Sequence, residues 1–267
     1  LGTIQQLGQI AGNEYVEQFV RAAQREVGVE RNQPAIDAVA AQLTGQASNS
    51  GVLDGSLPEN AEQAHSRLAA GEAALVWRKL VADTETPVGA ALKLIEPGRG
   101  DFLLESVEGG SVRGRYSLLG LDPDILFRAV GHACEVNRDW RHDRSAFQPL
   151  PGDSLAELRS LAESCRIDVP KALPPALACL VGYFGYETIG LVENLPRAPQ
   201  SALEMPDMLF ARPTLILVFD GLTDELFCIA PLWVDGADPA QAIERAGERI
   251  DEALSRLANA APPPVRD

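Results

Sequence analysis

Two carboxylates and two guanidinium groups lie between apolar runs in the segment FLLESVEGGSVRGRYSLLGLDP. The carboxylates belong to Glu105 and Glu108, and the guanidinium groups belong to Arg113 and Arg115. The apolar runs on either side are typical of the two strands of a β-hairpin, which places these charges near the turn that joins the strands. A carboxylate can bind an ammonium group, an arginine or a backbone N–H can bind a carboxylate, and apolar neighbours can hold a side chain. The segment therefore suits a free amino acid as a ligand.

The same charges also fit a purely structural role. A salt bridge from Glu105 to Arg113 or Arg115 across the hairpin would stabilise the hairpin and nothing else. Strand alternation places Glu105 on the same face as Leu103 and opposite to Leu104. The residues alone leave both interpretations open.

Other residues that could carry chemistry give no pattern. The sequence contains no G-x-S-x-G, H-E-x-x-H, P-loop or G-x-G-x-x-G motif. The four cysteines form no C-x-x-C pair and lie in apolar or periodic segments, so we expect reduced core thiols. The three histidines have no ligand or nucleophile partner at a suitable spacing. We predict no catalytic and no metal-binding residue in this chain.

The overall charge disfavours some partners. The net charge is −15 and the sequence pI is about 4.6, so the protein repels phosphate backbones. The longest apolar stretches are shorter than the roughly 20 residues that span a bilayer. We expect a soluble, cytoplasmic protein that binds neither nucleic acid nor membrane.

A change of composition near residue 50 suggests two parts. Residues 13–29 and a shorter segment that begins at Pro34 have the apolar spacing of two helices, and the segment GQASNSGVLDGSLPEN that follows has linker composition. We predict a helical amino-terminal extension with its linker at 1–50 and a larger domain at 51–267.

Most of the larger domain has the period of β-strands. We expect strands with short turns at 87–95, 102–107, 115–121, 124–130 and 133–139, then buried central strands at 176–187, 213–220 and 225–233. Short turns join antiparallel neighbours, because parallel strands need long crossovers. The pattern predicts an α+β fold with antiparallel β-sheets flanked by helices.

Helices interrupt these strands. We expect a first helix at 59–71, a second capped by Ser154 with Glu157, and a last one that begins at Asp238 and Pro239. The glycines of GYFGYE, Gly182 and Gly185, are in a strand context, where glycine lets another backbone approach closely.

Three long segments carry a family resemblance. LVWRKLVADTETPVGAALKL, FLLESVEGGSVRGRYSLLGLDPD and GYFGYETIGLVENLP closely resemble the amino-terminal domain of anthranilate synthase component I. The resemblance runs from about residue 58 to 259. It implies that the L-L-E-S segment lines a feedback site for the effector L-tryptophan, at Glu105, Ser106 and Val107.

The resemblance also implies what this chain lacks. The complete enzyme converts chorismate and ammonia or glutamine to anthranilate and pyruvate in tryptophan biosynthesis. Its chorismate-binding domain and its magnesium site have no counterpart in these residues, so we expect no cofactor here and no anthranilate synthesis by this chain alone. A glutamine amidotransferase subunit (component II) is the implied partner.

Alternatives remain. The equivalent domain of aminodeoxychorismate synthase component I, from folate synthesis, shares the fold, and a stand-alone amino-acid-binding module is the other possibility. Residues 1–45 lie outside the resemblance; they are weakly similar to the tail of a membrane-anchored foldase of the peptidyl-prolyl isomerase type, or form a helical extension.

Overall fold

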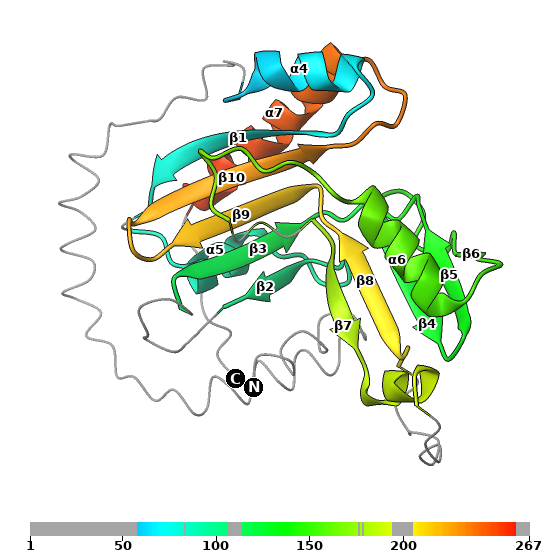
Figure 1. Cartoon of the computed structure of the whole chain (residues 1–267). Coiled ribbons are helices and arrows are strands. Elements are labelled where there is room, and N and C mark those ends of the chain that lie inside the picture. Colours follow the sequence, from blue (N-terminus) through cyan, green and yellow to red (C-terminus); the bar gives the residue numbers. More distant parts are fainter. Residues whose placement is uncertain are drawn as a thin grey trace, which may run out of the picture.

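Two five-stranded antiparallel sheets form the frame of the protein (Figure 1). The computed structural model describes residues 58–82, 84–105, 114–175, 177, 179–193 and 205–259. Sheet A has the order β1 (Ala74–Val81), β10 (Glu225–Leu232), β9 (Leu215–Asp220), β3 (Tyr116–Leu121), β2 (Phe102–Leu104). Sheet B has the order β6 (Gln148–Pro149), β5 (Ala133–Asn137), β4 (Ile125–Val130), β8 (Met208–Arg212), β7 (Val181–Phe184). The predicted α+β fold with antiparallel sheets is confirmed.

The chain passes between the sheets twice at one corner. The link from β3 to β4 and the link from β8 to β9 lie side by side there, where Thr214 N donates to Leu121 O and Asp124 N donates to Arg212 O, both at 3.1 Å. The Arg212 guanidinium also binds both carboxylate oxygens of Asp124, at 2.8 and 2.6 Å. A charge-assisted bidentate pair of this kind fixes the angle between the two sheets.

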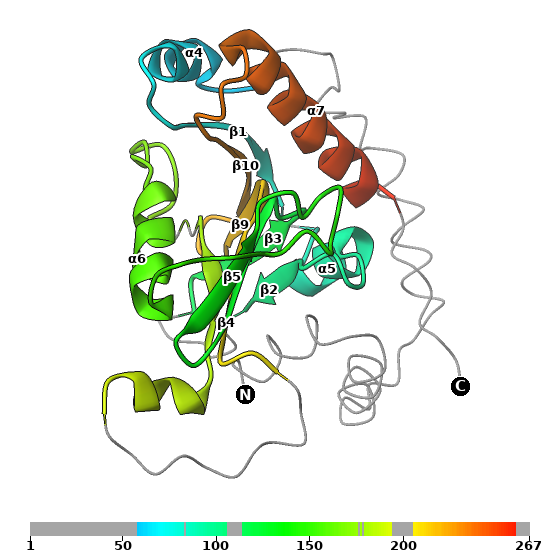
Figure 2. The same ribbon diagram turned by 90° about the vertical axis from the view of Figure 1, so that its right-hand side faces the viewer.

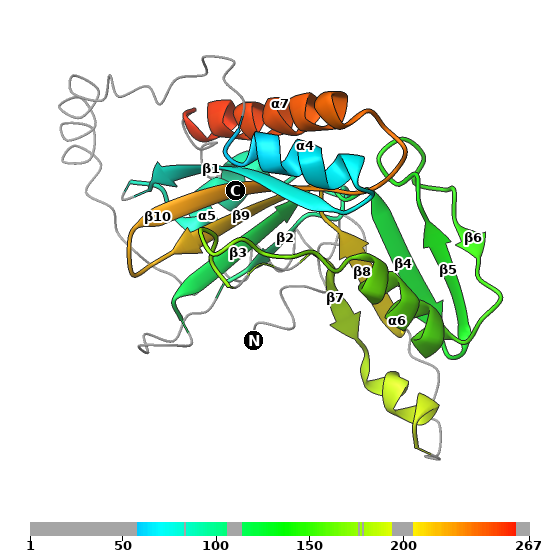
Figure 3. The same ribbon diagram turned by 45° about the horizontal axis from the view of Figure 1, so that its top comes forward.

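Three helices cover one face of sheet A (Figures 2 and 3). They are α4 (Ala61–Ala69), α5 (Pro87–Leu94) and α7 (Pro239–Leu257). The predicted start of α7 is confirmed, because the Asp238 carboxylate accepts from the N–H groups of Ala240 and Gln241, and Pro239 occupies the first turn. The inward stripe of α7, which includes Ile243 and Ile250, packs against the sheet.

Helix α6 (Ser154–Ser164) and the segment that follows it pack on the other side of the two sheets. Helix α6 packs on sheet B, on the other side from α5 and α7 (Figure 2). The segment after α6 crosses the second face of sheet A, where Ile167, Leu173 and Cys179 join the strand residues in an apolar layer. Both faces of sheet A are therefore buried, which is why β9 and β10 are almost continuously apolar.

Residues 87–94 form helix α5, so the strand predicted at 87–95 is wrong. Thr86 Oγ1 accepts a hydrogen bond from Gly89 N at 3.0 Å, and Pro87 occupies the first turn. Ala90 and Leu94, four residues apart, are fully buried. In this short apolar segment the period of two and the helical spacing coincide, and the Thr-Pro cap decides for the helix.

Two other predictions need correction. Helix α6 is capped by Asp153, whose side chain accepts from Leu155 N, and not by Ser154, whose hydroxyl donates to Gly131 O. Glu157 accepts from Gly152 N instead of completing the predicted capping box. The segment expected as a central strand at 176–187 contains β7, which is an edge strand of sheet B, followed by a 3-10 helix (Tyr186–Leu191).

The close-approach role of the two glycines is confirmed. A Cβ atom on Gly182 would lie 2.0 Å from Leu209 O, and one on Gly185 would lie 3.1 Å from Asp207 O. The predicted extension and linker at 1–50 lie outside the described residues.

Candidate functional site

The predicted site begins at the end of edge strand β2. Strand β2 pairs with β3, with Leu103 opposite Leu119 and Leu104 opposite Leu118. The predicted alternation is confirmed, because Leu103 packs against the helix-covered core and Leu104 packs against the apolar layer on the other face. Glu105 follows β2 directly and is exposed. Ser106 and Val107 lie outside the described residues, so their place in a site stays a prediction.

Arg115 has a partner other than the one expected. Its guanidinium donates from Nε to Asp220 Oδ1 at 2.7 Å and from an Nη to Asp220 Oδ2 at 2.5 Å. The same guanidinium lies 4.9 Å from the centre of the Tyr116 ring. The hydrogen bond from Arg115 holds the pKa of Asp220 below its ordinary value, although burial of the carboxylate opposes this shift.

Glu105 therefore has no salt bridge to Arg115, and Arg113 is outside the described residues. Within the part of the chain that the structure describes, no hydrogen bond or ion pair involves the Glu105 side chain. An exposed carboxylate at the end of an edge strand is accessible to a ligand or to another protein segment.

Sequence reasoning missed Asp220 at this location. It ends a strand that was expected to be buried, and its only sequence signal is that it is the first residue of the turn DGLTD. Its pairing with Arg115 follows from the position of β9 beside β3, with Tyr116 opposite Asp220, and two strands this far apart in sequence give no local sign of their pairing.

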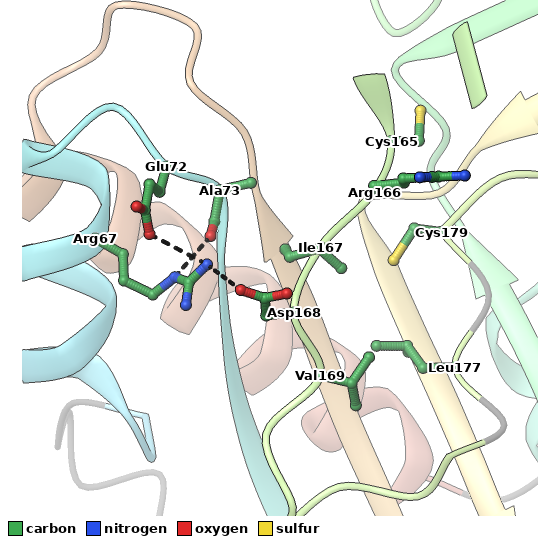
Figure 4. A pocket seen from close by; sticks show the side chains of 10 residues that line it. All are labelled: Arg67, Glu72, Ala73, Cys165, Arg166, Ile167, Asp168, Val169, Leu177 and Cys179. Carbon is green, nitrogen blue, oxygen red and sulfur yellow. Dashed lines mark hydrogen bonds and ion pairs between the residues drawn. The ribbon is translucent and has the colours of Figure 1, made fainter. Parts of the chain in front are cut away.

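A cavity lined by described residues lies elsewhere on sheet A (Figure 4). It has a volume of about 570 Å³ and is bounded by the end of α4, the start of β1 and the segment that follows α6. Its apolar floor includes Ile167, Leu177 and Cys179, which belong to the same layer as Leu104. Glu105 does not line this cavity.

Three of the four charged side chains that line this cavity, those of Arg67, Glu72 and Asp168, bind one another. Arg67 forms ion pairs with Asp168 at 3.0 Å and with Glu72 at 3.3 Å, and its Nε donates to Ala73 O at 3.1 Å. Figure 4 shows the guanidinium directed at both carboxylates. Arg67 is thus already satisfied, and it ties the segment after α6 to helix α4.

The thiols in the cavity wall are poor nucleophiles. Burial raises the pKa of Cys179 to about 12, and burial also raises the pKa of Cys165. A thiol with a raised pKa stays protonated at neutral pH and neither attacks an electrophile nor binds a metal readily. All four cysteines are buried and free, as predicted.

Metal chemistry finds no support in this part of the molecule. In the described ranges, no group of three or more His, Cys, Asp or Glu side chains is placed to hold a metal ion. The magnesium implied for a complete enzyme stays an expectation for that enzyme. No described helix is long and apolar enough to cross a membrane.

The fold is that of an α+β domain in which two antiparallel sheets meet at a corner and helices cover them on both sides. By sequence, the chain is homologous to the amino-terminal part of anthranilate synthase component 1. No protein-family model matches the chain.

Three relatives illustrate the homology. The chain is 44% identical over 199 residues to anthranilate synthase component 1 of Cereibacter sphaeroides, covering 74% of this chain and 40% of the relative. It is 31% identical over 204 residues to that of Arthrobacter globiformis, covering 76% and 35%. It is 35% identical over 170 residues to that of Thermus thermophilus, covering 63% and 34%. The chain thus spans less than half the length of these relatives.

A solved structure is also similar. Anthranilate synthase component I from Streptococcus pneumoniae TIGR4 superimposes with a TM-score of 0.46 at 21% identity, covering 71% of this chain and 38% of that chain. The homology itself rests on the sequence relatives.

Proposed function

We propose that this chain is the amino-terminal, regulatory part of an anthranilate synthase component I. In the complete, cytoplasmic enzyme, chorismate and ammonia or glutamine would be converted to anthranilate and pyruvate for tryptophan biosynthesis. The observation that carries the proposal is the 44% identity over 199 residues to a protein named anthranilate synthase component 1. A chain that covers 40% of that relative leaves room for a catalytic portion outside these 267 residues.

The effector we propose is L-tryptophan, bound beside the end of β2. Glu105 would accept hydrogen bonds from the ammonium group, while Ser106 and Val107 would contribute the wall beside it. The exposure of Glu105 and its lack of an ion pair within the described ranges support this role, since a carboxylate already bound to an arginine would be a weaker ammonium acceptor. The indole would contact apolar side chains, as aromatic ligands require.

Calorimetry with L-tryptophan tests the proposed site. We expect binding by a protein that contains this chain and the catalytic portion, and a loss of at least tenfold in affinity in Ser106→Ala and Glu105→Gln. Ser160→Ala, a matched change at an exposed serine on α6, should bind like the unaltered protein. Saturable binding that Ser106→Ala and Glu105→Gln leave unchanged would contradict the site.

The same experiment tests the pathway. If the 267-residue chain binds L-tryptophan by itself, the site is complete in this chain. If only the longer protein binds, the catalytic portion contributes to the site. If neither binds tryptophan and another amino acid does bind, the assignment to tryptophan biosynthesis is wrong.

Partner binding has a separate test. The proposed partner is a glutamine amidotransferase subunit (component II), and co-expression with the longer protein should yield a complex with glutamine-dependent anthranilate formation. Formation of aminodeoxychorismate instead would move the protein to the folate pathway.

A further inference from the structure

A small cavity between α7 and the corner of the two sheets contains an unpaired arginine. The cavity has a volume of about 50 Å³, and its charged lining residues are Arg99, Asp122, Arg249, Glu252 and Arg256. Arg249 lies in the middle of α7, between residues that face the core. This location is on the opposite face of sheet A from the larger cavity, because α7 and the segment after α6 cover different faces.

Arg249 has no hydrogen-bond or ion-pair partner among the residues that the structure describes. Its Nε atom has almost no contact with solvent and no hydrogen-bond acceptor, and no ion pair involves its guanidinium within the described ranges. The Arg249 side chain is half-buried, and a buried N–H group such as its Nε–H normally donates to an acceptor, because an unpaired buried polar group is costly. The Nε–H group of Arg249 lacks such an acceptor among the described residues.

The neighbouring charges already bind one another. Arg99 binds the buried carboxylate of Asp101 at 2.7 Å, and Arg256 binds Glu96 at 2.9 Å. The Asp122 carboxylate that lines the cavity accepts from Arg141 at 2.6 Å. After these pairs, Arg249 and Glu252 are the charged lining residues that form no ion pair within the described ranges.

The charges around Arg249 act on its pKa in both directions. Burial, followed by the positive charge of Arg141, lowers the pKa of Arg249, while Asp122 and Asp124 oppose this shift in part. An arginine side chain nevertheless keeps its proton at neutral pH. Arg249 therefore carries a positive charge that no ion pair with a described residue neutralises.

We propose that this cavity is a binding site for a single carboxylate group that neutralises Arg249. The size of the cavity excludes larger ligands, because about 50 Å³ accommodates one small planar anion or a few waters. The carboxylates of Asp122 and Glu252 at the rim disfavour a dianion such as phosphate. The carboxylate can come from a free small acid or from a Glu or Asp side chain of a docked protein, and this site does not depend on the proposed tryptophan function.

Glu252 is the internal competitor. It is exposed, lies one turn after Arg249 on α7 and lines the same cavity. In the structure it forms no ion pair with Arg249, but a different rotamer would bring the two charges closer. Glu252→Gln removes this competitor and should strengthen binding of an external carboxylate.

Nuclear magnetic resonance of the arginine Nε–H groups gives a direct test. The signal of Arg249 is assigned by its disappearance in Arg249→Gln. The 267-residue chain is titrated with sodium acetate at constant ionic strength, with chloride as the balancing anion. We expect a saturable shift of this signal with a Kd on the order of 1–10 mM, since a single charged contact carries the binding.

Thermal unfolding provides a second measurement. Acetate at tenfold its Kd should raise the melting temperature by roughly 3–5 °C relative to chloride. The rise should vanish in Arg249→Gln and persist in Arg245→Gln, a control at an exposed arginine one turn earlier on α7. If acetate moves neither the signal nor the melting temperature, or if Arg249→Gln responds like the unaltered chain, the site does not exist.

Two further arms complete the experiment. Tighter binding of N-acetyl-glutamate amide than of acetate would indicate a protein side chain as the natural source, and the reverse order would indicate a free acid. Weaker acetate binding in Glu252→Gln would overturn the proposed geometry, because removal of a competing carboxylate can only help an anion bind Arg249.

Discussion

Replacement of Gly182 by alanine should release edge strand β7 from sheet B. The new Cβ atom would lie 2.0 Å from Leu209 O and 2.6 Å from ring carbons of Phe210, much closer than carbon atoms approach these groups. The obstructing oxygen belongs to the backbone of β8, so no change of rotamer relieves the contact. Strand β7 must move away from β8 and lose its ladder hydrogen bonds.

The loss of stability is limited by what β7 contributes. Tyr183 is buried at 6% exposure, which is worth about 1.5–3 kcal/mol. Its hydroxyl donates to Pro206 O at 2.9 Å, which adds about 1 kcal/mol. The edge-to-face pair of Phe184 and Phe210 adds about 0.5–1.5 kcal/mol. The freed residues regain conformational entropy, so we expect a net loss of about 2–4 kcal/mol.

Hydrogen exchange and urea unfolding measure this effect. In Gly182→Ala, amides of residues 181–184 should exchange faster, while those of β9 and β10 should keep most of their protection. Gly190→Ala is the matched control, because a Cβ atom there meets nothing within 4 Å. Unchanged protection of residues 181–184, with a free energy of unfolding within about 0.5 kcal/mol of the original, would refute the close-approach reasoning.

Three further predictions concern other parts of the frame. Asp220→Asn should lower stability at pH 7. The folded state depresses the pKa of Asp220, so this stabilisation exists above the unfolded pKa of about 4 and is lost as the pH falls through the lower folded pKa. In urea unfolding, the difference in free energy of unfolding between Asp220→Asn and the original protein should therefore shrink below about pH 4. A difference that stays constant with pH would contradict this reasoning. Thr86→Ala should cost about 1 kcal/mol by removing the cap of α5, whereas Thr86→Ser should keep it; equal unfolding curves for Thr86→Ala and the original would speak against the cap. Cys228 is fully buried, and burial raises its pKa to about 12, so labelling of this thiol at pH 8 should require unfolding. The labelling rate should rise with urea as the free energy of unfolding falls, and rapid labelling without denaturant would contradict the burial of Cys228.

Local sequence signals predicted most of the elements but not their arrangement. The turn DGLTD between β9 and β10, and the Asp-Pro start of α7, both depend on residues close together in the chain. The pairing of β1 with β10, in which Ala74 lies opposite Leu232, joins segments more than 140 residues apart, and no local pattern predicts it. The division into two sheets is equally non-local, because it depends on the corner where β3 leads to β4 and β8 leads to β9.

The wrong predictions have a common cause. Apolar content indicates that a segment is buried but does not say against what, so the segment containing β7 was expected at the centre of a sheet and occurs at an edge. Phe184 in this strand is 55% exposed, although its sequence context is almost entirely apolar. For 87–94, the apolar pattern fits a strand and a helix equally, and only the cap at Thr86 separates them.

The position of the candidate site depends on the register of β2. Phe102 lies opposite Gly120, and its ring fills the space of the missing side chain, since a Cβ atom on Gly120 would lie 2.1 Å from that ring. A slip of one residue would bring the ring against a larger neighbour and would exchange the faces of Leu103 and Leu104. Glu105 would then leave β2 on the opposite side of the sheet. The glycine in β3 therefore fixes the direction in which the L-L-E-S segment leaves the strand, a constraint that the sequence of that segment alone does not contain.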